Sequence, residues 1–212
     1  MNLPLVPRLR GVFHQYAFFV AVAAGTTLGV LADGAVERVA VWVYAAALAA
    51  MFGASALYHR VRWRTAAARL RARRLDHAMI FVFIAGTYTP FALVAFGDTA
   101  GVILLAAVWA GAAFGLALEL AWIEGPRWLS ALAYLLVGWV GVVAAPRLFP
   151  ELGVAAAVLV IVGGALYSLG AVAYATTWPN PFPTTFGFHE VFHVLVIAAA
   201  VTQFVAVSLV VL

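Results

Sequence analysis

Three histidines and one aspartate could form a metal site in this chain. His59 closes one long apolar stretch, Asp76 opens the next, and His189 and His193 lie at the start of the last one. Ionisable side chains inside apolar helices are costly, so they usually face the protein interior and pair with each other or with a ligand. Because side chains four residues apart share a helix face, His189 and His193 can present two imidazoles to one ion. Ser55 and His59 have the same spacing.

Zinc suits these donors, because the chain contains no cysteine and only imidazole and carboxylate ligands remain. A catalytic zinc ion typically keeps three protein ligands and one open position. His59, His189 and His193 would supply the three ligands, and Asp76 would either bind the ion directly or hold a water in the fourth position. Zinc makes such a water nucleophilic near neutral pH. Ser55, one turn deeper than His59, could orient a substrate carbonyl or a ligand imidazole.

Simpler interpretations of the same residues stay open at this point. The histidines and Asp76 could form a polar network without metal, or Asp76 could cap the helix that it opens, where a carboxylate favours the helix dipole. Glu190 lies about 100° around the helix from the flanking histidines, which predicts a residue at the surface or behind the ligands. His77 is similarly off the face set by Asp76. His14, near the start of the first apolar stretch, is more typical of a packing or interfacial residue.

The composition of the chain predicts an all-α membrane protein. Of its 212 residues 67% are hydrophobic and only 9% are charged, and the mean hydropathy is +1.08. A soluble domain would carry about 25% charged residues. A helix needs about 20 apolar residues to cross a membrane, and seven stretches of this kind form one predicted domain, 1–212. They are 11–32, 37–60, 75–96, 100–122, 127–147, 152–176 and 187–211.

The first stretch is expected to be a retained helix, because its apolar core is longer than the roughly 7 to 15 residues of a cleaved signal peptide. Turn and charge signals separate the later stretches, among them the arginine-rich segment 60–74 and the proline-bounded run 146–150.

The basic residues predict the orientation of the bundle. All twelve are arginine, and an N-terminus inside the cell with seven spans places ten of them on the cytoplasmic side and only Arg38 and Arg147 outside. This positive-inside bias predicts a cytoplasmic N-terminus and a C-terminus on the far side. Seven arginines fall within 60–74, where contact with anionic lipid headgroups explains the net charge of +4 better than nucleic-acid binding does.

Three segments of the chain resemble a known family. SALYHR, LDHAMIFVFIAGTYTPF and FGFHEVFHVLV are similar to the signature regions of the hemolysin III proteins, the bacterial branch of the progestin and adipoQ receptor (PAQR) family. The start PRLRGVFH is also similar to that of bacterial members. The resemblance implies a seven-helix bundle in the bacterial inner membrane with zinc near its cytoplasmic face. By the same resemblance the ligands are His59, His189 and His193, with Asp76 holding a zinc-bound water and Ser55 close by.

The resemblance also links the chain to a wider group that looks like membrane hydrolases, including alkaline ceramidases, and to membrane lipid homeostasis. We therefore expect a zinc-dependent hydrolase that attacks an amide or ester bond of a membrane lipid, with Asp76 as general base. The alternative is a non-enzymatic membrane protein with a structural zinc ion, either a lipid-fluidity sensor or a pore-forming cytolysin. A pore should be lined by polar residues along its depth, whereas the outer halves of these stretches are almost wholly apolar. The oligomeric state stays open.

Overall fold

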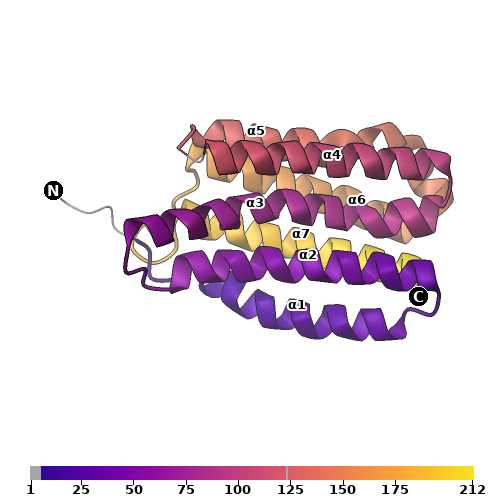
Figure 1. Cartoon of the computed structure of the whole chain (residues 1–212), viewed down its shortest axis with the longest axis horizontal. Coiled ribbons are helices and arrows are strands. Elements are labelled where there is room, and N and C mark those ends of the chain that lie inside the picture. Colours follow the sequence, from indigo (N-terminus) through magenta and orange to yellow (C-terminus); the bar gives the residue numbers. More distant parts are fainter. Residues whose placement is uncertain (1–5, 123) are drawn as a thin grey trace.

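A computed structural model of the protein describes residues 6–122 and 124–212, so the predicted domain 1–212 is described except for residues 1–5 and 123. The described residues form an elongated bundle in which the helices run along the long axis (Figure 1). The helices are α1 (Val12–Leu31), α2 (Ala35–Arg60), α3 (Ala66–Pro90), the π-helix η1 (Phe91–Phe96), α4 (Thr99–Ala121), α5 (Arg127–Gly138), the 3-10 helix η2 (Trp139–Ala144), α6 (Ala145–Thr176) and α7 (Phe188–Val211).

Six stretches of this bundle are long and apolar enough to cross a membrane, if α5, η2 and α6 are taken as one continuous stretch. Strands are absent from the described ranges, where Phe182 and Phe186 form only an isolated bridge. The prediction of an all-α membrane protein is therefore confirmed.

Helix α3 begins nine residues earlier than the predicted stretch 75–96. Thr65 caps its N-terminus, because the Thr65 hydroxyl accepts a hydrogen bond of 3.1 Å from the backbone N–H of Ala68. Residues 66–74, nine of the fifteen residues of the arginine-rich segment, are therefore helical rather than a loop. Asp76 lies about three turns inside the helix, so the interpretation of Asp76 as a helix cap is wrong.

The break predicted at residues 146–150 is also in the wrong place. Pro146 lies in the first turn of α6, where proline is tolerated, and Pro150 lies farther along inside the same helical range. The backbone leaves helical geometry at Gly153 instead, with φ 75° and ψ 167°. Glycine adopts this conformation readily because it has no Cβ.

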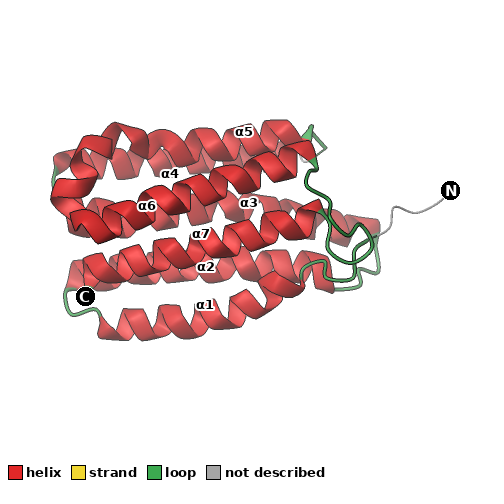
Figure 2. Cartoon of the chain, turned by 180° about the vertical axis from the view of Figure 1, so that it is seen from behind, coloured by secondary structure: helices red, strands yellow, loops and turns green. Residues whose placement is uncertain are grey.

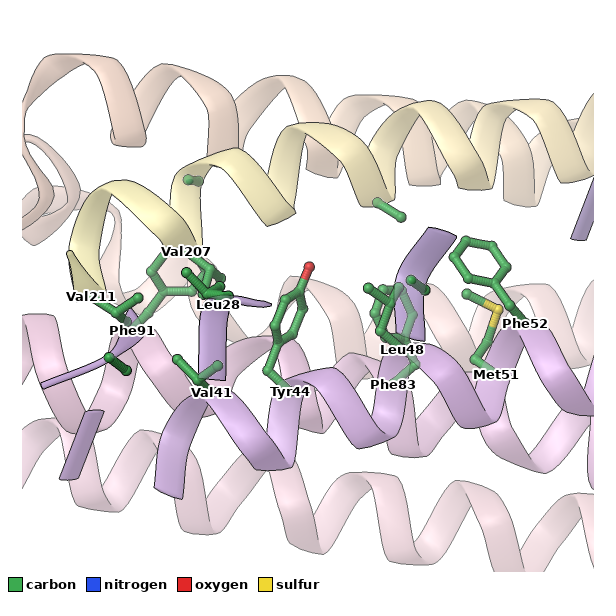
Figure 3. Packing of buried hydrophobic residues seen from close by; sticks show 14 of the residues in the cluster. Leu28, Val41, Tyr44, Leu48, Met51, Phe52, Phe83, Phe91, Val207 and Val211 are labelled. Atoms are coloured by element: carbon green, nitrogen blue, oxygen red, sulfur yellow. The ribbon is translucent and has the colours of Figure 1, made fainter. Parts of the chain in front are cut away.

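Helix α7 is at the centre of the packing. It contacts α1, α2, α3 and α6, and Figure 2 shows it between α2 and α6. Buried side chains such as Tyr44, Leu48 and Val207 fill the space between α2 and α7 (Figure 3). Small residues allow other helices to approach closely: a Cβ added to Gly86 of α3 would lie 2.5 Å from the Cβ of Ala47 on α2.

The loops at one end of the bundle are joined by backbone hydrogen bonds. The N–H groups of Arg8 and Leu9 each donate a bond of 3.1 Å, to the carbonyls of Thr184 and Thr185 in the connection between α6 and α7. The chain just before α1 is thereby fixed beside the start of α7. The C-terminal end of α2 lies at the same end of the molecule (Figure 2).

Candidate metal centre

Two helices bring three imidazoles together at this end of the bundle. His59 lies in the last turn of α2, His189 lies in the first turn of α7, and His193 follows one turn later. The Nε2 atoms of His59 and His189 are 3.1 Å apart. One ring nitrogen from each of the three histidines lies within 4.8 Å of the other two. The spacing of the two α7 histidines therefore directs both rings toward α2.

The donors in this cluster fit a zinc ion. A tetrahedral zinc with Zn–N distances of about 2.0 to 2.1 Å holds its nitrogens about 3.3 to 3.4 Å apart, close to the 3.1 Å between His59 and His189. His193 is 1% exposed, and its buried Nδ1 atom has no hydrogen-bond partner among the residues that the structure describes. Buried nitrogens seldom lack a partner. A cluster of three imidazoles with such an atom could hold a metal ion.

Asp76 lies next to the same imidazoles. Its Oδ2 atom is 3.5 Å from Nε2 of His59, the ring nitrogen that also faces His189. Asp76 is 9% exposed and sits in the interior of α3. A carboxylate in this position can reach either an ion between the rings or a water bound to that ion, which are the two roles expected from the sequence.

His14 is a further member of the cluster, although the sequence favoured a packing or interfacial role for it. Its Nδ1 atom lies 2.8 Å from the hydroxyl oxygen of Ser55. Its ring stacks on that of His193, with centroids 3.7 Å apart and an interplanar angle of 8°. The sequence does contain a signal for this role: His14 is an ionisable residue in the first turn of an apolar helix, at the depth of the other histidines.

Glu190 is fully buried rather than a surface residue. Its Oε1 atom forms an ion pair of 2.5 Å with Nε of Arg10, and its Oε2 atom accepts a hydrogen bond of 2.8 Å from the N–H of Gly187. The carboxylate therefore caps its own helix and binds the segment that precedes α1. Glu190 lies off the face of the two histidines, as its helical position predicts, but the sequence does not predict that the segment with Arg10 covers this face.

A second buried polar cluster lies beside the candidate metal centre. His77 turns away from the three histidines, and its Nδ1 atom lies 3.4 Å from Oε2 of Glu119 on α4. The hydroxyl of Tyr134 on α5 donates a hydrogen bond of 3.4 Å to Oε1 of the same carboxylate. Glu119 was missed in the sequence, although an acidic residue within the apolar stretch 100–122 is a signal for a buried polar contact.

A cavity of about 390 Å³ starts at the candidate metal centre. Asp76, Ser55, His189 and His193 line one end, and apolar side chains form most of its remaining wall. The lining residues on α7 continue as far as Gln203, which corresponds to about 21 Å of helix. The cavity therefore joins a cluster of polar groups to a long apolar space between helices.

Comparisons with known proteins show the family of this chain. Residues 5–204 match the family described as Haemolysin-III related. The chain is 35% identical over 134 residues to the Hemolysin-3 homolog of Bacillus subtilis, covering 63% of this chain and 60% of that protein. It is 34% identical over 134 residues to Hemolysin-3 of Bacillus cereus, covering 63% of this chain and 58% of that protein. These alignments thus span less than two thirds of either Bacillus protein. Human Monocyte to macrophage differentiation factor is 25% identical over 198 residues, which are 92% of this chain and 79% of that protein.

Proposed function

Because this chain belongs to the haemolysin-III related family, we propose that it is a membrane-embedded, zinc-dependent hydrolase of amide or ester bonds in lipids, with a role in membrane lipid homeostasis. One observation carries the proposal: a three-histidine cluster and a buried carboxylate lie together at one end of an apolar cavity. Polar groups converging at the end of an apolar pocket are the usual form of a site for small, largely apolar ligands.

The residues divide the proposed chemistry among them. His59, His189 and His193 would hold a zinc ion, which supplies Lewis acidity to polarise a carbonyl group and to activate water near neutral pH. Asp76 would accept the proton of the attacking water as general base and return it to the leaving amine or alcohol. The Ser55 hydroxyl, which also lines the cavity, would donate a hydrogen bond to the carbonyl oxygen of the substrate.

The apolar part of the cavity favours a lipid as the substrate. About 21 Å of α7 lines it, at 1.5 Å per residue, and this length is most of the hydrocarbon thickness of a membrane, about 30 Å. A lipid chain lying there would bring its amide or ester bond to the histidine end. Water would be excluded from the chain but present at the polar end, as a hydrolysis requires.

We also propose seven membrane spans in the bacterial inner membrane, with the N-terminus in the cytoplasm and the C-terminus outside. The interruption at Gly153 supports this count, because residues 127–152 and 154–176 are each long enough to span a bilayer. The arginine distribution supports the orientation, and the exposed arginines of 60–74 would bind anionic lipid headgroups. Since the chain has no cysteine, single cysteines introduced at Arg64 and at Leu212 should be labelled from opposite sides of the membrane.

The activity can be tested with purified, zinc-loaded protein in lipid nanodiscs. We expect it to release fatty acid from a ceramide, an acylated lipid or a phospholipid, and we expect His193→Ala to abolish both zinc binding and turnover. Wild-type turnover that does not exceed that of His193→Ala for any of these lipids would refute the enzymatic proposal.

Asp76→Asn separates this proposal from a sensor or cytolysin with a structural zinc ion. If Asp76 is the general base, the variant keeps its zinc and loses its activity, because an amide of similar size cannot accept the proton. If the biological activity of the protein persists in a zinc-loaded Asp76→Asn variant, the metal has a structural role.

A further inference from the structure

His14 has no part in the chemistry just described, yet it touches two of the residues involved. It is 2% exposed, and it lines the same cavity as Ser55 and His193. Its Nδ1 atom is 2.8 Å from the Ser55 hydroxyl, while its ring lies 3.7 Å from that of His193. A buried imidazole with two such contacts needs an explanation beyond packing.

The contact with Ser55 restricts a group that would otherwise rotate. A serine hydroxyl has one hydrogen and turns to suit its neighbours, and Ser55 also lies close to the carboxylate of Asp76. With one hydrogen, Ser55 can donate to only one of these neighbours at a time. When Nδ1 of His14 carries the ring hydrogen, it donates to the Ser55 oxygen and leaves the hydroxyl hydrogen for the carbonyl oxygen of a substrate. The bond then holds the Ser55 oxygen in place and occupies one of its lone pairs, so that fewer directions remain for its hydrogen.

The contact with His193 restricts the plane of a ligand ring. The terminal torsion of histidine is broad and has no sharp staggered minimum, so packing must decide how the ring lies. The His14 ring is nearly parallel to it, with an interplanar angle of 8°. Because the lone pair of an imidazole nitrogen lies in the ring plane, holding the plane also holds the direction from which His193 can bind an ion.

The position of His14 is itself determined by contacts of α1 with α2. Gly11, which precedes α1, has φ 76°, and a Cβ added there would collide with the Cβ of His59. One residue after His14, the Gln15 side chain accepts a hydrogen bond of 3.0 Å from Nε of Arg60. Phe52 of α2 contacts the His14 ring edge to face, with centroids 5.0 Å apart. The ring is therefore held from the same helix that carries Ser55 and His59.

We propose that His14 is a positioning residue of the metal centre, which orients the Ser55 hydroxyl through Nδ1 and fixes the plane of His193 by stacking. The inference rests on the proposed function, since it concerns the same site. The two contacts of His14 can be tested separately, because one acts on the Ser55 hydroxyl and the other on His193, a proposed metal ligand.

Two substitutions separate the contacts. His14→Phe keeps an aromatic ring over His193 but has no nitrogen for Ser55. His14→Asn keeps an amide atom near the position of Nδ1 but has no ring. Tyr16→Phe on the same helix is the matched control, because Tyr16 is 69% exposed on the outer surface of the bundle. Ser55→Ala and the double variant His14→Phe/Ser55→Ala complete the set.

The readouts are the zinc affinity from competition with a chelator, the visible spectrum of the cobalt-substituted protein, and lipid turnover. We expect His14→Asn to change the cobalt spectrum and to lower the zinc affinity by about tenfold, the lower end of the effect of residues that orient metal ligands. His14→Phe should keep the cobalt spectrum of the wild type and lose turnover to the same extent as Ser55→Ala. The double variant should be no worse than either single variant.

The inference is overturned if His14→Asn leaves the cobalt spectrum and zinc affinity unchanged, or if the losses from His14→Phe and Ser55→Ala multiply in the double variant. Should wild-type protein hydrolyse none of the lipids, the proposed function fails separately. The cobalt spectrum then still tests the stacking contact. The Ser55 contact is then tested by the unfolding midpoints of the same variants, which are expected to be non-additive.

Discussion

Removing Arg10 should destabilise the protein more than removing its ion-pair partner Glu190. The two side chains differ in burial, since Glu190 is 0% exposed and Arg10 is 21% exposed. In Arg10→Met, the Glu190 carboxylate stays buried and keeps only its hydrogen bond from Gly187. In Glu190→Gln, the guanidinium can turn toward solvent, and the amide oxygen can still accept the hydrogen bond from Gly187.

The expected magnitudes follow from this asymmetry. Breaking a buried ion pair by removing one partner costs about 3 to 5 kcal/mol, because a buried charge is left uncompensated, and we expect this loss for Arg10→Met. For Glu190→Gln we expect about 1.5 to 3 kcal/mol, the contribution of one hydrogen bond to a charged group. The double variant should recover about 1 to 3 kcal/mol relative to the sum of the single changes.

The free energy of unfolding can be measured from the loss of helical circular dichroism in mixed micelles of mild detergent and dodecyl sulfate. Arg147→Met is the matched control, since the ion pair of Arg147 with Asp98 joins side chains that are 29% and 50% exposed. Water and salt screen an exposed pair of this kind, so Arg147→Met should change the stability very little. Equal losses for Arg10→Met and Arg147→Met, or a double variant without recovery, would contradict the assignment of Glu190 as a buried and paired charge.

Three other predictions concern the backbone near the site, the exposed loop before α4, and the metal. Gly11→Ala should lower the free energy of unfolding by about 2 to 4 kcal/mol, because the backbone of Gly11 is left-handed and the added Cβ collides with His59. In the same assay Gly111→Ala should be close to neutral, because its added Cβ makes only ordinary contacts of 3.5 Å or more. The N–H of Gly101 lowers the pKa of Asp98 below its usual range, so the contribution of Asp98 is present above about pH 4 and is lost as the pH falls through the lowered pKa. The difference in melting temperature between wild type and Asp98→Asn should therefore shrink in acid, and a constant difference would contradict this. A chelator should lower the stability of the zinc-loaded protein by about 2.7 kcal/mol if free zinc was present at 100 times its Kd, and an unchanged melting temperature would argue against a bound ion.

The sequence by itself was enough to predict the class of the protein and the residues at its polar end. Each helix in a membrane must satisfy its own backbone hydrogen bonds. The composition and length of an apolar stretch, which are local properties of the sequence, are therefore enough to predict a membrane-spanning helix. The spacing of His189 and His193 is likewise a local property of one helix. The start of α3 was less accurate, because arginines that are polar enough to resemble a loop continue the helix once Thr65 has capped it.

The partners of the polar residues were decided only by the tertiary structure. That His14 meets Ser55, that Arg10 covers Glu190 and that Glu119 faces His77 all depend on which helices become neighbours. The helical period gives the direction of a side chain around the axis of its helix. It carries no information about which neighbouring segment that side chain will contact. The burial of Glu190 shows this difference: its helical position was known, and its environment was supplied by a segment 180 residues away in the chain.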